Sequence, residues 1–171
     1  GFGTLDELYE MLTLMQTGKA NIIPIVLLEG NRSTYWEKWD QYIQHNLMQE
    51  GWISPEDRSF YYLASSPESA VDHIFRFYFR YHSSRYVNNT LVIRLSKPIS
   101  EIHLENLNAD FADLVAEGKM IMSGPIEGET DHLDLPRLVF VHNRNHFGRL
   151  RQLIDAINSE PIKSIKPKFG T

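Results

Sequence analysis

The sequence predicts an α/β protein in two parts, the C-terminal part of a doubly wound parallel sheet followed by a small α+β appendage. Helical and strand-like patterns alternate over the first 82 residues. Residues 22–28 are β-branched and nearly all apolar, as expected of a strand buried on both faces of a parallel sheet. The chain also opens on a glycine-rich turn that leads directly into an amphipathic helix, an arrangement with which α/β proteins hold phosphate.

The first part is predicted in the order turn, helix, strand, helix, strand, helix. Apolar residues recur at helical spacing after the opening turn, and Gly18 stands where that helix would stop. Pro67 lies at a first helical position and starts the last helix of this part, which we expect to reach about His82. The elements between these two helices are a strand at 22–28, a helix with a broad aromatic face at 35–47 and a strand at 60–64.

The composition changes near residues 83–89, and the appendage is predicted to begin there. Residues 1–86 are therefore predicted as the sheet domain, residues 87–158 as the α+β appendage and residues 159–171 as a loosely held tail. The appendage is predicted in the order strand, helix, strand, strand, helix. Its strands are expected at 90–95, 119–123 and 138–141, and its helices around 104–114 and 147–157.

The composition of the 171 residues is that of an ordinary soluble globular protein, with 42% hydrophobic and 23% charged residues. The net charge of −5 gives no indication of nucleic acid or of an anionic membrane as a partner. No apolar run approaches the roughly 20 residues of a membrane span. Cysteine is absent, which excludes disulfides and thiolate chemistry and favours a cytoplasmic location.

The opening residues Gly1, Gly3 and Thr4 have the chemistry of a phosphate site. Backbone N–H groups converge at a helix start, the helix dipole favours an anion there, and a missing Cβ allows close approach. The Thr4 hydroxyl can add a donor. A purely structural interpretation stays open, because Thr4 and Glu7 have the spacing of a capping box.

The longer string around these residues resembles the LONELY GUY (LOG) family, whose hallmark is Pro-Gly-Gly-x-Gly-Thr-x-x-Glu. Gly1 matches the second of the paired glycines, Gly3 and Thr4 match the Gly-Thr, and Glu7 matches the final Glu. The resemblance covers roughly residues 1–82 and is most specific over the first 28. Because the Pro and the first Gly are expected before Gly1, we expect the chain to be the C-terminal part of a longer protein.

The resemblance implies a Rossmann-like homodimer that hydrolyses the N-glycosidic bond of a nucleoside 5′-monophosphate, either cytokinin-like or an ordinary purine or pyrimidine nucleotide. The products would be a free base and ribose 5-phosphate, and no cofactor or metal would be needed. Gly1, Gly3 and Thr4 would hold the phosphate and ribose, and Glu7 would be the catalytic carboxylate. Basic residues of the family, an Arg in particular, are expected upstream of Gly1. The alternative is a nucleotide-binding or sensing module without turnover.

Many sequences of this kind carry the label lysine decarboxylase, which predicts pyridoxal phosphate bound to a lysine. Lys19 and Lys38 lie at an ordinary helix end and on a helix surface, and Lys97 and Lys119 fall in the appendage. Since none has the setting of a Schiff-base lysine, this interpretation is rejected.

Three further features have both a functional and a structural interpretation. Asn145, His146 and Arg149 could form an anion site at the start of the last helix, although a solvated cap is commoner. The acidic stretch 127–134 matches no metal-ligand spacing, so an exposed loop is expected there. The surplus of aromatic residues on the helices after the opening motif predicts that part of their surface is a subunit interface.

Overall fold

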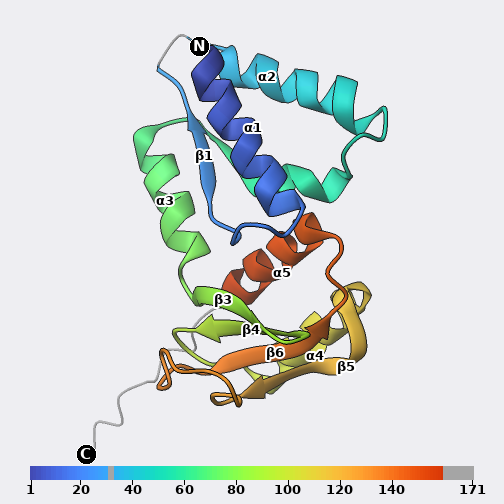
Figure 1. Ribbon diagram of the computed structural model, residues 1–171. Helices are drawn as coiled ribbons and strands as arrows, with labels where there is room; N and C mark the ends of the chain where they lie inside the picture. The colour runs from blue at the N-terminus through green and yellow to red at the C-terminus, as the bar shows by residue number, and fades with distance from the viewer. Residues whose placement is uncertain (31–32, 160–171) are drawn as a thin grey trace, which may run out of the picture.

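The computed structural model describes residues 1–30 and 33–159 (Figure 1). It contains a two-stranded parallel sheet, β1–β2, and a four-stranded antiparallel sheet in the order β3-β4-β6-β5. The predicted mixed α/β class is confirmed at the level of these two sheets. Within the described ranges, no helix is both long and apolar enough to cross a lipid bilayer.

The parallel sheet is formed by β1 and β2, which pair from Ile25 opposite Tyr61 to Leu28 opposite Ala64. Figure 1 shows α1 and α3 on opposite sides of β1. The predicted alternation of helices and strands is confirmed for this part. In chain order the elements are α1 (Phe2–Gln16), β1 (Ile25–Leu28), α2 (Tyr35–Ile43), the π-helical turn η1 (Gln44–Met48), the 3₁₀ segment η2 (Pro55–Phe60), β2 (Tyr61–Ala64) and α3 (Pro67–Phe77).

The opening glycine-rich turn was predicted as a separate element, and this is wrong in detail. Helix α1 begins at Phe2, so Gly3 and Thr4 lie in its first turn, and Gly1 is the N-cap. The capping box between Thr4 and Glu7 is not formed, because the cap is three residues earlier and makes no side-chain hydrogen bond. Gly1 stands at the cap and Gly3 in the first turn, so the helix begins without a capping side chain.

The antiparallel sheet packs against α4 and α5. The strands predicted from residues 90, 119 and 138 onwards are confirmed as β4, β5 and β6, and the last predicted helix is confirmed as α5. The elements of this part are β3 (Tyr81–Val87), β4 (Thr90–Leu95), α4 (Glu101–Asp110), the short 3₁₀ turn η3 (Ala112–Leu114), β5 (Val115–Ser123), β6 (Arg137–His142) and α5 (Phe147–Ser159).

Helix α3 ends at Phe77 rather than near His82, and the following residues form the unpredicted strand β3. The side chain of Asn158, at the end of α5, causes this change. Its Oδ1 accepts from the backbone N–H groups of Arg80 (2.8 Å) and Tyr81 (3.0 Å), and its Nδ2 donates to the carbonyl of Phe77 (2.6 Å). This cap comes from a residue about 80 positions away, so the residues around the helix end do not indicate it.

The larger of two hydrophobic clusters joins the two parts of the chain, and α5 contributes four of its buried residues. Met15 of α1 and Phe60 of η2 lie in the same buried cluster as Ile93 of β4 and Ile154 of α5. Strand β3 runs across residue 86, where the sheet domain was predicted to end. The division into 1–86, 87–158 and 159–171 stays a prediction, and of its tail only Ser159 is within the described residues.

Gly148 lets α5 approach the first part of the chain very closely. A Cβ at this position would lie 2.6 Å from the carbonyl carbon of Glu56 in η2, a distance that real Cβ atoms do not adopt. One residue earlier, the ring of Phe147 packs on Gly18, which has a positive φ of 68° after the end of α1. Small residues on facing elements therefore fix α5 against both α1 and η2.

The acidic stretch 127–134 was expected to be an exposed loop, and this is wrong for Glu129, whose side chain is fully buried. Arg94 of β4 and Arg137 of β6 stand directly opposite each other in the sheet, and like charges in that position repel. Glu129 pairs with both, at 2.9 Å to Arg94 Nη2 and 2.9 Å to Arg137 Nε. The loop therefore supplies the counter-charge that two buried arginines require.

Candidate functional site

The residues predicted to bind and act on a nucleotide all lie on the first two turns of α1. Residues three or four apart share a helix face, so Gly3, Thr4 and Glu7 lie together on one side. That side is exposed to solvent, whereas Leu8 is buried and packs with Leu27 of β1. The structure therefore brings the predicted residues together on the outward face of a helix that is firmly held by its other face.

The N-terminus of α1 has no side chain bonded to its first-turn N–H groups. The N-termini of the neighbouring helices are occupied. The Glu29 carboxylate accepts from the backbone N–H of Trp36 in α2 (3.0 Å), and Ser66 Oγ accepts from Ser69 N in α3 (3.1 Å). First-turn N–H groups and the helix dipole are the features with which a helix start binds an anion.

A cavity of about 370 Å³ lies at the carboxyl ends of β1 and β2. Ligands of open parallel α/β sheets bind at this edge, because the connecting loops and helix starts meet there. Figure 1 shows the start of α1 at the same end of the sheet as the start of α2. The cavity is lined by Leu27, Glu29, Gly30, Ser33, Trp36, Glu37, Leu63, Ala64 and Ser65.

The lining of this cavity was not predicted from the sequence. Two carboxylates, Glu29 and Glu37, and two hydroxyls, Ser33 and Ser65, face it, and no lysine or arginine stands among the described residues that line it. The described part of this surface accepts hydrogen bonds from hydroxyl and amino groups. The signal that could have located it is the position of Glu29 and Ser65 directly after the two parallel strands.

A buried polar network holds α2 against the strand and loop behind the cavity. Asp40 accepts bonds from Arg58 Nη2 (2.9 Å), Tyr61 Oη (2.6 Å) and Gln44 Nε2 (2.7 Å). Burial opposes the charged carboxylate, but these donors outweigh it and hold the pKa of Asp40 below its usual range. Burial also raises the pKa of Tyr61, so its hydroxyl stays a donor to Asp40. All the capacity of this carboxylate is used within the fold, which makes it structural.

The residues suggested for an anion site at the start of the last helix, Asn145 and Arg149 among them, have partners within the fold. Arg149 pairs with Asp113 at 3.1 Å and lies over the ring of Phe111, so its charge is used within the fold. Asn145 precedes the start of α5 by two residues, and its N–H bonds to Asn143 Oδ1 (3.0 Å). Within the described part of the chain, no three His, Asp or Glu side chains are grouped as a metal site would require.

Comparison with known families adds a second, independent observation to this geometry. Residues 1–74 match the family described as "Possible lysine decarboxylase". This match confirms the resemblance to the LOG family on which the roles of Gly1, Gly3, Thr4 and Glu7 rest. The LOG segment contains α1, the parallel sheet, α2 and most of α3. Comparisons with curated proteins and with solved structures gave no significant match.

The decarboxylase in that description would require a lysine for pyridoxal phosphate, and the lysines that the structure describes do not fit the role. A Schiff-base lysine is desolvated in the cofactor pocket. All four lysines in the described ranges are exposed: Lys19, Lys38, Lys97 and Lys119. The cavity at the carboxyl ends of β1 and β2 contains no lysine among its described residues either.

Proposed function

We propose that the protein is a phosphoribohydrolase that cleaves a nucleoside 5′-monophosphate into a free base and ribose 5-phosphate. The observation that carries the proposal is the match of residues 1–74 to the LOG family, with its Gly-x-Gly-Thr-x-x-Glu string on the first two turns of α1. We further propose that β1 and β2 belong to a Rossmann-like sheet. The same family match and the lack of cysteine support an enzyme of the cytoplasm.

The proposed roles follow from the chemistry of each position. Backbone N–H groups around Gly1 and Gly3, with the Thr4 hydroxyl, hold the 5′-phosphate. Ribose hydroxyls and base amino groups face the acceptors of the adjoining cavity, where Glu29 and Ser33 lie. Anchoring the phosphate places binding energy far from the reacting bond, where it can be used to orient the sugar.

Glu7 acts at the anomeric carbon. Water forms a bond to C1′ while the bond from C1′ to the base nitrogen breaks, and the base leaves with the electron pair. Glu7 stabilises the oxocarbenium-like charge and accepts the proton of the attacking water, which finally resides on the base. The overall reaction is nucleoside 5′-monophosphate plus water, giving the free base plus ribose 5-phosphate.

A panel assay tests this function. We expect the full-length protein, incubated with purine, pyrimidine and cytokinin-type nucleoside monophosphates, to release ribose 5-phosphate from at least one of them. Release is measured by a coupled colorimetric assay and base formation by chromatography. If a folded protein binds a nucleotide, as seen by calorimetry, but releases no sugar from any member of the panel, the sensing module is the correct interpretation.

We also propose that the protein is a homodimer that buries the exposed apolar face of α3. Phe75 is 72% exposed, and the patch around it is larger than isolated surface residues explain. The patch consists of Val71, Ile74, Phe75, Tyr78 and Phe79.

Replacing Phe75 by Glu is expected to convert the dimer to monomer, because a desolvated charge at an apolar interface costs several kcal/mol. Sedimentation velocity measures the change. Asn89→Glu, which adds the same charge in the exposed β3–β4 turn, should leave the sedimentation coefficient unaltered. An unchanged coefficient for the Phe75 variant would exclude this face as the interface.

A further inference from the structure

Helix α3 is held on the rest of the molecule by few buried side chains. Of its 11 residues, Ala70 and Phe77 are buried. His73 is half-buried and stands three residues after Ala70 and four before Phe77, so the three residues share one face of the helix. The exposed patch around Phe75 lies on another face. His73 is therefore the polar residue of the face by which α3 is attached.

His73 contacts two other elements of the fold. Its ring stacks on the ring of Tyr62 in β2, with the centroids 4.2 Å apart and the planes 2° from parallel. Its Nε2 lies 3.3 Å from Nη2 of Arg151 in α5. The imidazole is thus the point at which α3 meets both the parallel sheet and the C-terminal helix of the described chain.

The guanidinium of Arg151 is enclosed by the protein, with 1% of the side chain exposed. Its Nε donates to both carboxylate oxygens of Asp155 (3.1 and 3.2 Å), and the group lies 4.6 Å from the centroid of the Phe77 ring. Its Nη1 has no hydrogen-bond partner among the described residues. A buried guanidinium that lacks one partner depends strongly on the partners that remain, because an uncompensated buried charge is costly.

The contact between Arg151 and His73 fixes the protonation state of the imidazole. A guanidinium stays protonated in proteins and offers only donors. Nη2 of Arg151 therefore donates, and Nε2 of His73 accepts through its lone pair. This bond requires a neutral ring with its hydrogen on Nδ1. Uptake of a proton at Nε2 would remove the acceptor and would place a second positive charge beside the buried guanidinium.

The surroundings of His73 oppose a proton on its ring. Arg151 faces it from α5, Arg76 and Asp72 from α3 itself, and Tyr62 from β2. Burial, followed by Arg151 and Arg76, lowers the pKa of His73 from its usual 6.5, and Asp72 opposes this shift. A released ring regains its usual pKa and binds more protons than the attached ring. The attachment is therefore complete above pH 6.5 and weakens as the pH falls below that value.

We propose that His73 makes the attachment of α3 dependent on pH: the neutral ring accepts from Arg151 and keeps the helix on α5 and β2, and uptake of a proton releases the helix. Release uncovers Phe77 and displaces the exposed patch around Phe75, so any contact that this patch makes weakens on acidification. The proposal does not depend on the phosphoribohydrolase function, because none of these residues belongs to the proposed nucleotide site.

Hydrogen–deuterium exchange of the full chain tests this proposal, measured by mass spectrometry at about pH 7.5 and about pH 5, on either side of the histidine range. The rates are corrected for the intrinsic effect of pH on amide exchange. We expect the protection factors of α3 to fall at least about threefold at the lower pH, since proton uptake favours the released helix. Strand β4 is the internal reference, because it is paired on both sides within the antiparallel sheet.

The decisive variant is His73→Gln, because the side-chain carbonyl of glutamine can accept from Arg151 at every pH and does not titrate. We expect α3 of this variant to keep its protection at the lower pH. His45→Gln is the matched control. It removes an exposed histidine of η1, whose ring bonds to the carbonyl of Gln41 (2.7 Å), and it should lose protection of α3 as the wild type does.

Three exchange results would overturn the proposal: equal protection of wild-type α3 at the two pH values, an equal loss in β4, or the same loss in His73→Gln. NMR titration of the His73 Hε1 resonance in the wild type is an independent measurement, and a midpoint below 6.5 is expected. A midpoint at or above 6.5 contradicts the proposal. If His73→Gln does not fold, this midpoint and the comparison of α3 with β4 in the wild type decide the matter.

Discussion

Replacement of Glu7 by Gln is expected to lower kcat for ribose 5-phosphate release by about 10²- to 10⁴-fold, the usual contribution of a positioned acid–base group. The amide keeps the size of the side chain but can neither accept a proton nor stabilise positive charge at C1′. Because Glu7 is exposed and the α1 cap does not use it, the melting temperature should hardly change. Nucleotide affinity should also be nearly unchanged, since the phosphate is held by backbone groups of the first turn.

Steady-state kinetics with the preferred nucleotide and calorimetry with its product separate turnover from binding. The matched control is Asp6→Asn, which removes a neighbouring exposed carboxylate to which no role is assigned. Full activity in the Glu7 variant, or an equal loss in the Asp6 variant, would show that Glu7 does not carry out the chemistry.

The second large effect is expected in stability. Glu129→Gln should lower the free energy of unfolding by about 3–5 kcal/mol, because it leaves Arg94 and Arg137 buried without their counter-charge. Glu127→Gln, an exposed residue of the same loop, should change stability by less than about 0.5 kcal/mol. Urea denaturation of the two variants measures the difference. A loss no larger than that of Glu127→Gln would mean that the two arginines do not need Glu129.

The same carboxylate predicts a specific dependence on pH. Burial opposes its ionisation, but the bonds from Arg137, Ile126 N and Arg94 outweigh this and lower the pKa of Glu129 from 4.5 to about 2. Its contribution to stability is therefore complete above pH 4.5 and is lost as the pH falls toward 2. The wild-type protein should lose stability over this range by more than Glu129→Gln does. Burial also lowers the pKa of His142 to about 4, but that group is present in both proteins and cancels in the comparison.

The sequence was sufficient to predict those elements that depend on residues close to one another along the chain. The presence of a strand in the apolar run 22–28 and the proline that starts α3 were predicted correctly, because periodicity and local caps indicate such elements. The expected burial of that strand on both faces is wrong, since only Leu27 of β1 is buried and Leu28 is exposed. The residues of the LOG string were also found, since they are contiguous and lie on two turns of one helix.

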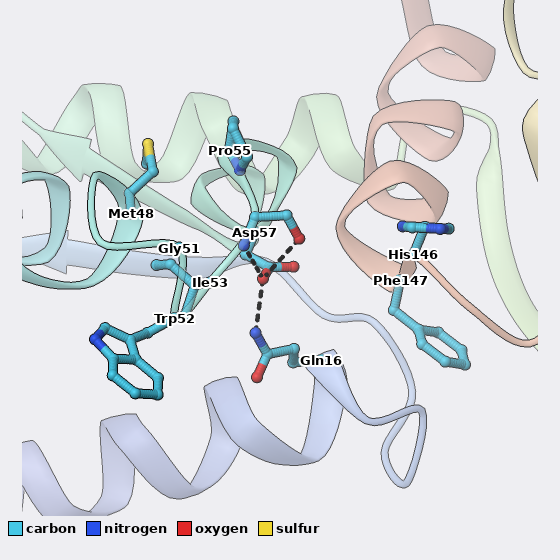
Figure 2. Close-up of a pocket in the computed structure, with 10 residues that line it drawn as sticks. Gln16, Met48, Gly51, Trp52, Ile53, Pro55, Asp57, His146 and Phe147 are labelled. Atoms are coloured by element: carbon cyan, nitrogen blue, oxygen red, sulfur yellow. Dashed lines mark hydrogen bonds between the residues drawn. The ribbon is translucent and has the colours of Figure 1, made fainter.

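The features that were missed depend on residues far apart in the sequence. The end of α3 is set by Asn158, and the burial of Glu129 is set by two arginines on different strands. A cavity at the C-terminal end of α1 is lined by Trp52 and Asp57 together with His146, nearly 90 positions later (Figure 2). No local pattern contains these pairings, because each joins residues that only the tertiary fold brings together.

The position of α5 has a consequence for how the chain reaches its native state. This helix, the C-terminal element of the described chain, completes the burial of Met15 and Phe60, which precede it by more than 80 residues. Contacts of such long sequence separation form slowly, because the loop entropy is lost before they are made. During synthesis, the apolar surface of α1 and η2 around Met15 and Phe60 stays partly uncovered until residues 147–159 emerge from the ribosome. The core at the C-terminal end of α1 is thus completed by the helix that is translated last among those described.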